Sequence, residues 1–130
     1  MIGPEIHIAL IGAGRWGALH AKKLEKLEGA RLVAVVDPDI DKASALAQHY
    51  PGCTASADLA SCPAGIHAAS VTTPAAALFG VGQRALLSGY DVFLEKPVAT
   101  TAEEAGVLAR LAARGERVAV AGLVERFNPS

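Results

Sequence analysis

The sequence predicts an α/β fold in which one parallel sheet of about six strands carries helices on both faces. Apolar runs typical of buried strands alternate along the chain with segments of helical periodicity. Glycine, proline and capping residues separate these segments. Strands joined by helices of this length run parallel with right-handed crossovers. The expected result is a doubly wound sheet with the strand order 3-2-1-4-5-6.

The first strand leads into a glycine turn and then into an amphipathic segment. The turn holds three glycines, Gly12, Gly14 and Gly17. Gly12 permits a sharp reversal, Gly14 lets the backbone approach a pyrophosphate, and Gly17 lets the helix pack closely. Arg15 and Trp16 would offer backbone N–H groups at a helix N-terminus, which favours bound phosphate.

The second strand, residues 31–36, ends at Asp37, which lies 20 residues beyond Gly17. A carboxylate at this position can accept both hydroxyls of an adenosine ribose, and it repels a 2′-phosphate. The unit therefore predicts a nicotinamide or flavin dinucleotide site that prefers NAD over NADP. Lys42, the nearest downstream cation, could moderate this preference but not reverse it.

The next helix is capped by Asp39 and ends at Pro51-Gly52. Its expected inward face consists of Ile40, Ala43, Ala47 and Tyr50. A short strand at residues 53–54 and a loop with one helical turn around Asp58 follow. Residues 67–71 are the fourth expected strand.

Thr73 is the expected N-cap of the third helix, with Pro74 at its first position and Gly89 at its end. The inward residues of this helix are Leu78, Val81 and Ala85. Residues 91–94 and 117–121 are the fifth and sixth strands. Between them, Thr101 opens a helix through a capping-box pattern, and Gly115 ends it.

Length and composition limit the possible classes of protein. A chain of 130 residues with 52% hydrophobic content is sufficient for one core, so residues 1–130 are expected to be a single domain. The 12 basic and 13 acidic residues are dispersed, which argues against nucleic-acid and membrane partners. No apolar run approaches the roughly 20 residues of a membrane span, and a cytoplasmic protein is expected.

Metal-ligating patterns are not apparent in the sequence. Two cysteines, Cys53 and Cys62, lack metal-ligand spacing and are expected to be free thiols. The histidines are scattered without a shared face, so core or surface roles are favoured over metal binding for His7, His20, His49 and His67.

In an open parallel sheet, ligands bind beyond the carboxyl ends of the strands. Besides the glycine turn and Asp37, the polar residues at these ends are Thr72, Thr73, Pro74, Glu95, Lys96 and Arg126. Lys96 could accept or relay the proton of an alcohol that loses hydride to a nicotinamide. The alternative is a solvated lysine paired with Glu95. Ser70 lacks a Gly-x-Ser-x-Gly context, so a hydrolase triad is not supported.

The strand-end motifs together resemble the N-terminal domain of the Gfo/Idh/MocA oxidoreductases, which include glucose-fructose oxidoreductase and inositol 2-dehydrogenase. The resemblance covers essentially the whole chain. It rests on the glycine turn and on VVDPD at 35–39, TTP at 72–74, EKP at 95–97 and ERFNP at 125–129. The EKP motif is the most specific of these. The resemblance implies that Lys96 contacts both the nicotinamide ribose and the substrate hydroxyl.

Two departures from the family pattern affect the expected function. Ala75 and Leu78 stand where family members often carry Asn and His, and the sequence ends at Ser130 before the substrate domain that members carry. The leading hypothesis is therefore the NAD-binding part of a dehydrogenase for a sugar, cyclitol or related alcohol, with an incomplete active site. A stand-alone dinucleotide-binding module, such as a redox sensor or regulatory subunit, is the alternative. In either case exposed apolar surface would favour self-association.

Overall fold

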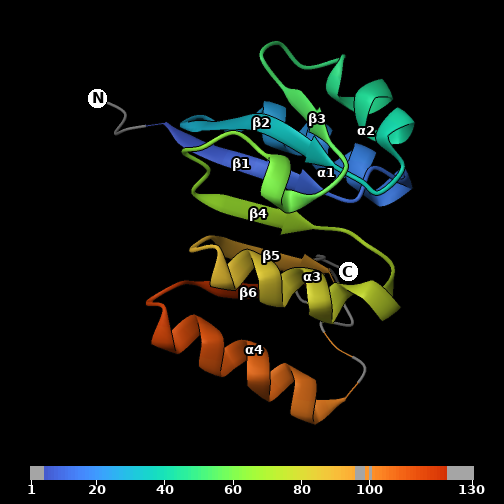
Figure 1. The fold of residues 1–130 in the computed structure, drawn as a ribbon. Coiled ribbons are helices and arrows are strands. Elements are labelled where there is room, and N and C mark those ends of the chain that lie inside the picture. The colour runs from blue at the N-terminus through green and yellow to red at the C-terminus, as the bar shows by residue number, and fades with distance from the viewer. Residues whose placement is uncertain (1–4, 96–98, 100, 123–130) are drawn as a thin grey trace, which may run out of the picture.

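One parallel sheet of six strands organises the molecule (Figure 1). The computed structural model describes residues 5–95, 99 and 101–122. The strand order is β3-β2-β1-β4-β5-β6, which confirms the predicted topology. The strands are β1 (Ile6–Ile11), β2 (Ala30–Val36), β3 (Thr54–Ser56), β4 (Ala68–Val71), β5 (Asp91–Glu95) and β6 (Ala119–Gly122). The helices are α1 (Arg15–Glu25), α2 (Ile40–Ala47), α3 (Ala75–Leu87) and α4 (Ala102–Arg114), with a 3-10 turn at Leu59–Ser61.

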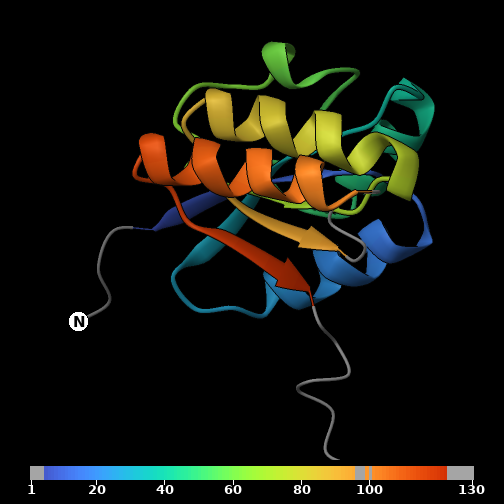
Figure 2. The same cartoon turned by 90° about the horizontal axis from the view of Figure 1, so that it is seen from below.

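The helices cover the two faces of the sheet in pairs. The chain winds outward from β1 to β3 and then, in the opposite direction, from β4 to β6, so right-handed crossovers place the two halves' helices on opposite faces. Leu10 and Val35 pack with alanines of α1 and α2 on one face. Val71, Leu94 and Leu78 form the core under α3 and α4 on the other face (Figure 2). The direction of winding changes between β1 and β4, and ligands bind at such a switch point.

The face of the sheet that α1 covers is bare over β5 and β6 in the described part of the chain (Figure 2). The strand register aligns Leu10, Ser70, Phe93 and Val120 in one row across this face. Leu10 and Ser70 are buried, whereas Phe93 is 36% exposed and Val120 is 47% exposed. Phe93 and Val120 thus form a strip of exposed apolar surface, of the kind that the sequence analysis expected.

The longest helices, α3 and α4, have 13 residues each and bury one face against the sheet. Gly82 of α3 sits where a Cβ atom would come within 3.1 Å of the Leu94 side chain. Among the described helices, none combines the length and the hydropathy that crossing a membrane requires.

The predicted caps hold at two helices and fail at a third. Asp39 accepts hydrogen bonds from the N–H groups of Asp41 (3.1 Å) and Lys42 (3.4 Å), and Thr101 accepts one from Glu104 (3.0 Å). At α3 the N-cap is Pro74, not Thr73, and the helix begins at Ala75. Pro74 has φ −55° and ψ 151°, an extended conformation that suits the cap position better than the first helical position.

Other differences concern element bounds and one inward face. β3 begins one residue after Cys53, and β6 begins at Ala119 instead of Arg117. The N–H groups just before β6 have other partners: Arg117 donates to the carbonyl of Ala112, and Val118 donates to the carboxylate of Asp91 at 2.8 Å. On α2, Ala43 and Ala47 are buried as expected, but Ile40 is exposed. Tyr50 lies beyond the end of the helix, yet it packs against the same core as predicted.

Candidate functional site

A cleft of about 1120 Å³ lies at the carboxyl ends of the strands, at the switch point between β1 and β4. Nine of the predicted site residues line it, which are Gly12, Gly14, Arg15, Trp16, Asp37, Thr72, Thr73, Pro74 and Glu95. Gly17 lies behind the loop that forms the floor of the cleft. Lys96 and Arg126 lie outside the described residues. The structure thus brings together side chains from the ends of β1, β2, β4 and β5.

The loop after β1 has a backbone shape that only glycine adopts readily. Gly12 has φ +108°, and a Cβ atom there would lie 2.8 Å from the hydroxyl oxygen of Thr72. The Gly12 N–H donates to the carbonyl of Val36 (2.8 Å). The hydroxyl of Thr72 lies 3.0 Å from the Gly12 carbonyl oxygen and 3.2 Å from that of Ile11, so it donates to the loop. Thr72 therefore holds the loop in place as well as lining the cleft.

The other two glycines of the turn meet different surroundings. A Cβ atom on Gly17 would overlap the carbonyl oxygen of Gly12, so this glycine allows α1 to begin directly against the loop. A Cβ atom on Gly14 would have no atom within 4 Å. Gly14 lines the cleft, and its missing side chain leaves room there for a ligand.

The N-terminus of α1 opens into this cleft and suits an anion. Gly14 is the N-cap and makes no side-chain capping bond, so the N–H groups of the first turn remain for a ligand. The positive end of the helix dipole adds to this preference. Arg15 and Lys42 add positive side chains to the wall of the cleft. Trp16 lines the cleft and is 62% exposed, so its side chain does not pack beneath the loop.

Asp37 lies at the end of β2 with its carboxylate fixed by backbone donors. One oxygen accepts from the N–H of Ala13 in the glycine loop (2.9 Å), and the other accepts from the N–H of Asp39 (2.8 Å). Each carboxylate oxygen can accept a second hydrogen bond. The side chain is therefore oriented in advance and retains one acceptor site per oxygen for the two hydroxyls of a ribose.

Thr73 presents an unusual hydroxyl at the opposite wall of the cleft. Within the described part of the chain its Oγ1 atom is buried and has no hydrogen-bond partner. A buried polar group without a partner costs about 1–3 kcal/mol. A ligand group in the cleft could satisfy this oxygen.

Residues 6–123 match the model of an oxidoreductase family with an NAD-binding Rossmann fold, named GFO_IDH_MocA. The chain belongs to the Gfo/Idh/MocA oxidoreductase family. It is 32% identical over 127 residues to an inositol 2-dehydrogenase from Arthrobacter sp. (strain FB24), covering 95% of this chain and 38% of that protein. The chain thus spans well under half the length of the curated relatives it matches.

Solved structures of other proteins share the fold. UDP-N-acetylglucosamine 3-dehydrogenase GnnA from Acidithiobacillus ferrooxidans superimposes with a TM-score of 0.89 at 29% identity, covering 99% of this chain and 40% of that one. GenD2 from gentamicin A biosynthesis, in complex with NAD, has a TM-score of 0.87 at 27% identity, covering 94% and 35%. The chain therefore has the NAD-binding Rossmann fold of this family, and the cleft lies at the switch point of that fold.

Six of the other residues that line the cleft were not singled out as site residues by the sequence analysis. They are Ala57, Asp58 and Leu59 of the loop after β3, and Ala77, Val81 and Arg84 of α3. The three α3 residues are spaced at i, i+4 and i+7, so they share one helix face. That spacing was the available signal, but it does not reveal which element the face meets.

The histidines are less scattered than the sequence indicated. His7 and His67 lie at the opposite edge of the sheet from the cleft, where β1 and β4 begin, with ring centroids 5.5 Å apart. The Nδ1 atom of His67 accepts from the backbone N–H of His7 (2.9 Å), so the expectation of no shared position is wrong for this pair. His20 lies on the cleft side, bonded to Glu95. Among the described residues, no three metal-ligating side chains group together.

Proposed function

We propose that this chain is the cofactor-binding part of a dehydrogenase that oxidises a sugar, cyclitol or related alcohol, and that it prefers NAD over NADP. The observation that carries the cofactor preference is the carboxylate of Asp37, which Ala13 and Asp39 hold in the cleft next to the glycine loop. Its two remaining acceptor sites match the two hydroxyls of the NAD adenosine ribose.

A 2′-phosphate at the same position would bring a charge of about −2 against this carboxylate. Arg15 and Lys42 line the same cleft and reduce the repulsion. Within the described part of the chain neither is bonded to Asp37, whose hydrogen-bond partners are both backbone N–H groups. The negative charge therefore dominates at the ribose position, and NADP is the weaker ligand.

Titration calorimetry with NADH and NADPH tests the preference. For the unaltered chain we expect NADH to bind at least about tenfold more tightly, because one repelled charge at close range exceeds 1.4 kcal/mol. Asp37→Ser should reduce this ratio several-fold. Asp41→Asn is the matched control, since it removes a nearby carboxylate of α2 that does not line the cleft. Tighter binding of NADPH, or an unchanged ratio in Asp37→Ser, would overturn the assignment.

The reaction that we propose rests on the chain's membership of the Gfo/Idh/MocA oxidoreductase family. A bound nicotinamide would supply hydride-transfer chemistry at the carbinol carbon of the substrate. Lys96, which directly follows Glu95 in the sequence, would accept the hydroxyl proton. Inositol 2-dehydrogenase and UDP-N-acetylglucosamine 3-dehydrogenase among the relatives make a polyol or sugar the leading substrate class.

The incomplete active site is tested by assaying the chain itself. We expect the 130-residue chain to bind cofactor but to form no NADH from NAD⁺ and myo-inositol above background. Substrate-dependent NADH formation would show that residues 1–130 hold a complete site.

Four other expectations stay predictions. They are the single-domain organisation, the cytoplasmic location, the alternative of a stand-alone module, and self-association through the strip at Phe93 and Val120. Light scattering at two protein concentrations tests self-association.

A further inference from the structure

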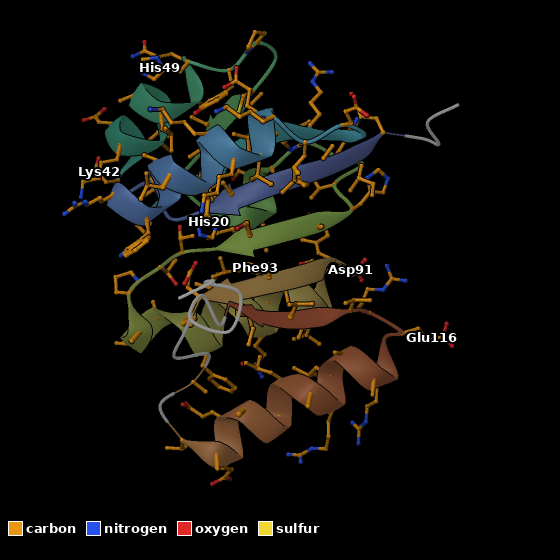
Figure 3. All side chains as sticks on the ribbon, turned by 180° about the vertical axis from the view of Figure 1, so that it is seen from behind. His20, Lys42, His49, Asp91, Phe93 and Glu116 are labelled. Carbon is orange, nitrogen blue, oxygen red and sulfur yellow. The ribbon has the colours of Figure 1, made fainter. Side chains whose placement is uncertain are left out.

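His20, Ser70 and Glu95 form a hydrogen-bonded row on the α1 side of the sheet. The Nδ1 atom of His20 lies 2.8 Å from the Ser70 hydroxyl, and its Nε2 atom lies 2.7 Å from a carboxylate oxygen of Glu95. The sheet register creates this row. Ser70 pairs with Phe93, and Glu95, two residues further along β5, points to the same face. Figure 3 shows His20 and Phe93 on this face, with their ring centroids 5.7 Å apart.

The ionised carboxylate of Glu95 determines which atoms of the row donate hydrogen bonds and which accept them. An ionised carboxylate only accepts hydrogen bonds, so the Nε2 atom of His20 carries the proton that points to Glu95. In the neutral ring, Nδ1 is then the acceptor and the Ser70 hydroxyl is its donor. The side chains of His20 and Glu95 are only 15% and 20% exposed. Ser70 therefore fixes the ring, and the ring fixes the carboxylate.

The order serine, histidine, carboxylate is also that of a hydrolase triad, but the arrangement does not fit one. Ser70 is buried within β4, and it does not line the cleft. A nucleophilic hydroxyl must reach its substrate. Glu95 is the member of the row that does line the cleft. The row therefore presents a carboxylate to the ligand, not a nucleophile.

Glu95 lies at the end of β5, on the other side of the switch point from Asp37 at the end of β2. A dinucleotide whose adenosine ribose meets Asp37 extends across the switch point, so its nicotinamide lies toward β4 and β5. The nicotinamide ring of NAD⁺ carries a positive charge, which the ring of NADH lacks. A carboxylate held nearby distinguishes the two forms by electrostatic attraction.

We propose that His20, oriented by Ser70, is a positioning residue that holds an ionised Glu95 at the nicotinamide end of the cleft, where Glu95 favours the oxidised cofactor. This inference rests on the proposed dinucleotide binding. It adds that the chain selects the redox state of its ligand and that three residues outside the glycine turn determine the selection.

Calorimetric titration with NAD⁺, NADH and ADP-ribose at about pH 8, above the usual range of histidine titration, tests the proposal. Glu95→Gln should weaken NAD⁺ about tenfold, because a charge pair roughly 10 Å apart at an effective dielectric constant of about 20 changes affinity by at least that factor. NADH should weaken less, and ADP-ribose, which lacks the nicotinamide, should stay within about twofold. The Kd ratio of NADH to NAD⁺ therefore falls.

Variants of the two supporting residues should lower the same ratio by a smaller factor. His20→Leu removes the donor to Glu95, whereas His20→Gln keeps an N–H donor and should restore part of the ratio. Ser70→Ala is the milder variant if His20→Leu does not fold. His7→Leu is the matched control, because His7 also contacts a glutamate, Glu5 at 3.2 Å, but Glu5 does not line the cleft, whereas Glu95 does.

The outcomes separate this inference from the proposed function. Equal weakening of all three ligands in Glu95→Gln or His20→Leu means that the row only supports the fold, and it overturns the inference while dinucleotide binding stands. An unchanged Kd ratio in Glu95→Gln overturns the inference in the same way. A folded, unaltered chain that binds none of the three ligands overturns the proposed function itself.

Discussion

Replacing Gly17 with alanine should destabilise the protein, although alanine is the better helix former. The added methyl group would overlap the carbonyl oxygen of Gly12 and lie 3.0 Å from the carbonyl carbon. Relief requires the loop to move, which weakens the bond from the Gly12 N–H to Val36 (2.8 Å). Backbone overpacking costs about 1–3 kcal/mol. The weakened hydrogen bond costs about 1 kcal/mol, and helix propensity returns about the same amount.

The net expected loss for Gly17→Ala is therefore about 2 kcal/mol, or a decrease in Tm of about 8 °C for a chain of this size. Thermal unfolding followed by circular dichroism measures this decrease. Gly14→Ala is the matched control, because its methyl group would meet no atom within 4 Å. We expect Gly14→Ala to keep its Tm within about 3 °C but to lose at least about tenfold in NADH affinity, because its methyl group projects into the cleft. A Tm of Gly17→Ala at or above that of the unaltered chain would refute the steric argument.

Three further predictions concern the rest of the described structure. Burial raises the pKa of Cys53 to about 11 from 9.0, so iodoacetamide should react more slowly with the folded chain than in denaturant. Because the folded state holds this proton more tightly, the protonated Cys53 thiol contributes to the free energy of unfolding. This contribution is complete below about pH 9 and is lost as the pH rises through about 11. Urea titrations at several pH values would show the loss. Thr101→Ala removes the N-cap bond of α4 and should cost about 1 kcal/mol in urea unfolding. Leu78→Ala should cost about 2–5 kcal/mol at a buried site, whereas Leu87→Ala, on the exposed side of the same helix, should cost under about 1 kcal/mol; equal losses would contradict the core assignment.

The sheet order and the glycine turn were predictable because their signals are local. Gly12, Gly14, Gly17 and Asp37 fall within one strand–helix–strand unit, and their spacing alone indicates a shared site. The structure places Gly12, Gly14 and Asp37 at one cleft and adds a steric reason for Gly12 and Gly17. The carboxylate of Asp37 bonds to the N–H of Ala13 across 24 positions, a contact that follows directly from the pairing of β1 with β2.

The row of His20, Ser70 and Glu95 could not be predicted in the same way. His20 is 50 positions from Ser70 and 75 from Glu95. Periodicity places each residue on one face of its own element, but it does not say which faces meet. That outcome depends on the register of β4 against β5 and on the position of α1 over the sheet. A single serine among apolar residues of a buried strand was the available hint, because a buried hydroxyl needs a partner.

The prediction of Thr73 as the N-cap of α3 was wrong for a different reason. Threonine before proline is a common helix-start pattern, and it fits either residue as the cap. Only the backbone angles at Pro74 distinguish the two possibilities, and they depend on how the chain leaves β4. The hydroxyl of Thr73 was therefore released from capping and became the unpartnered group in the cleft.

The bond from Thr72 to the Gly12 carbonyl also has a consequence for folding kinetics. It joins residues 60 positions apart, so the glycine loop acquires its shape only after β1 and β4 have paired. Contacts of such long range form late in folding, once the entropy of closing the intervening chain has been overcome. A dinucleotide that binds only the finished loop stabilises the native state and leaves the transition state untouched. Saturating cofactor should accordingly slow unfolding and leave the refolding rate the same.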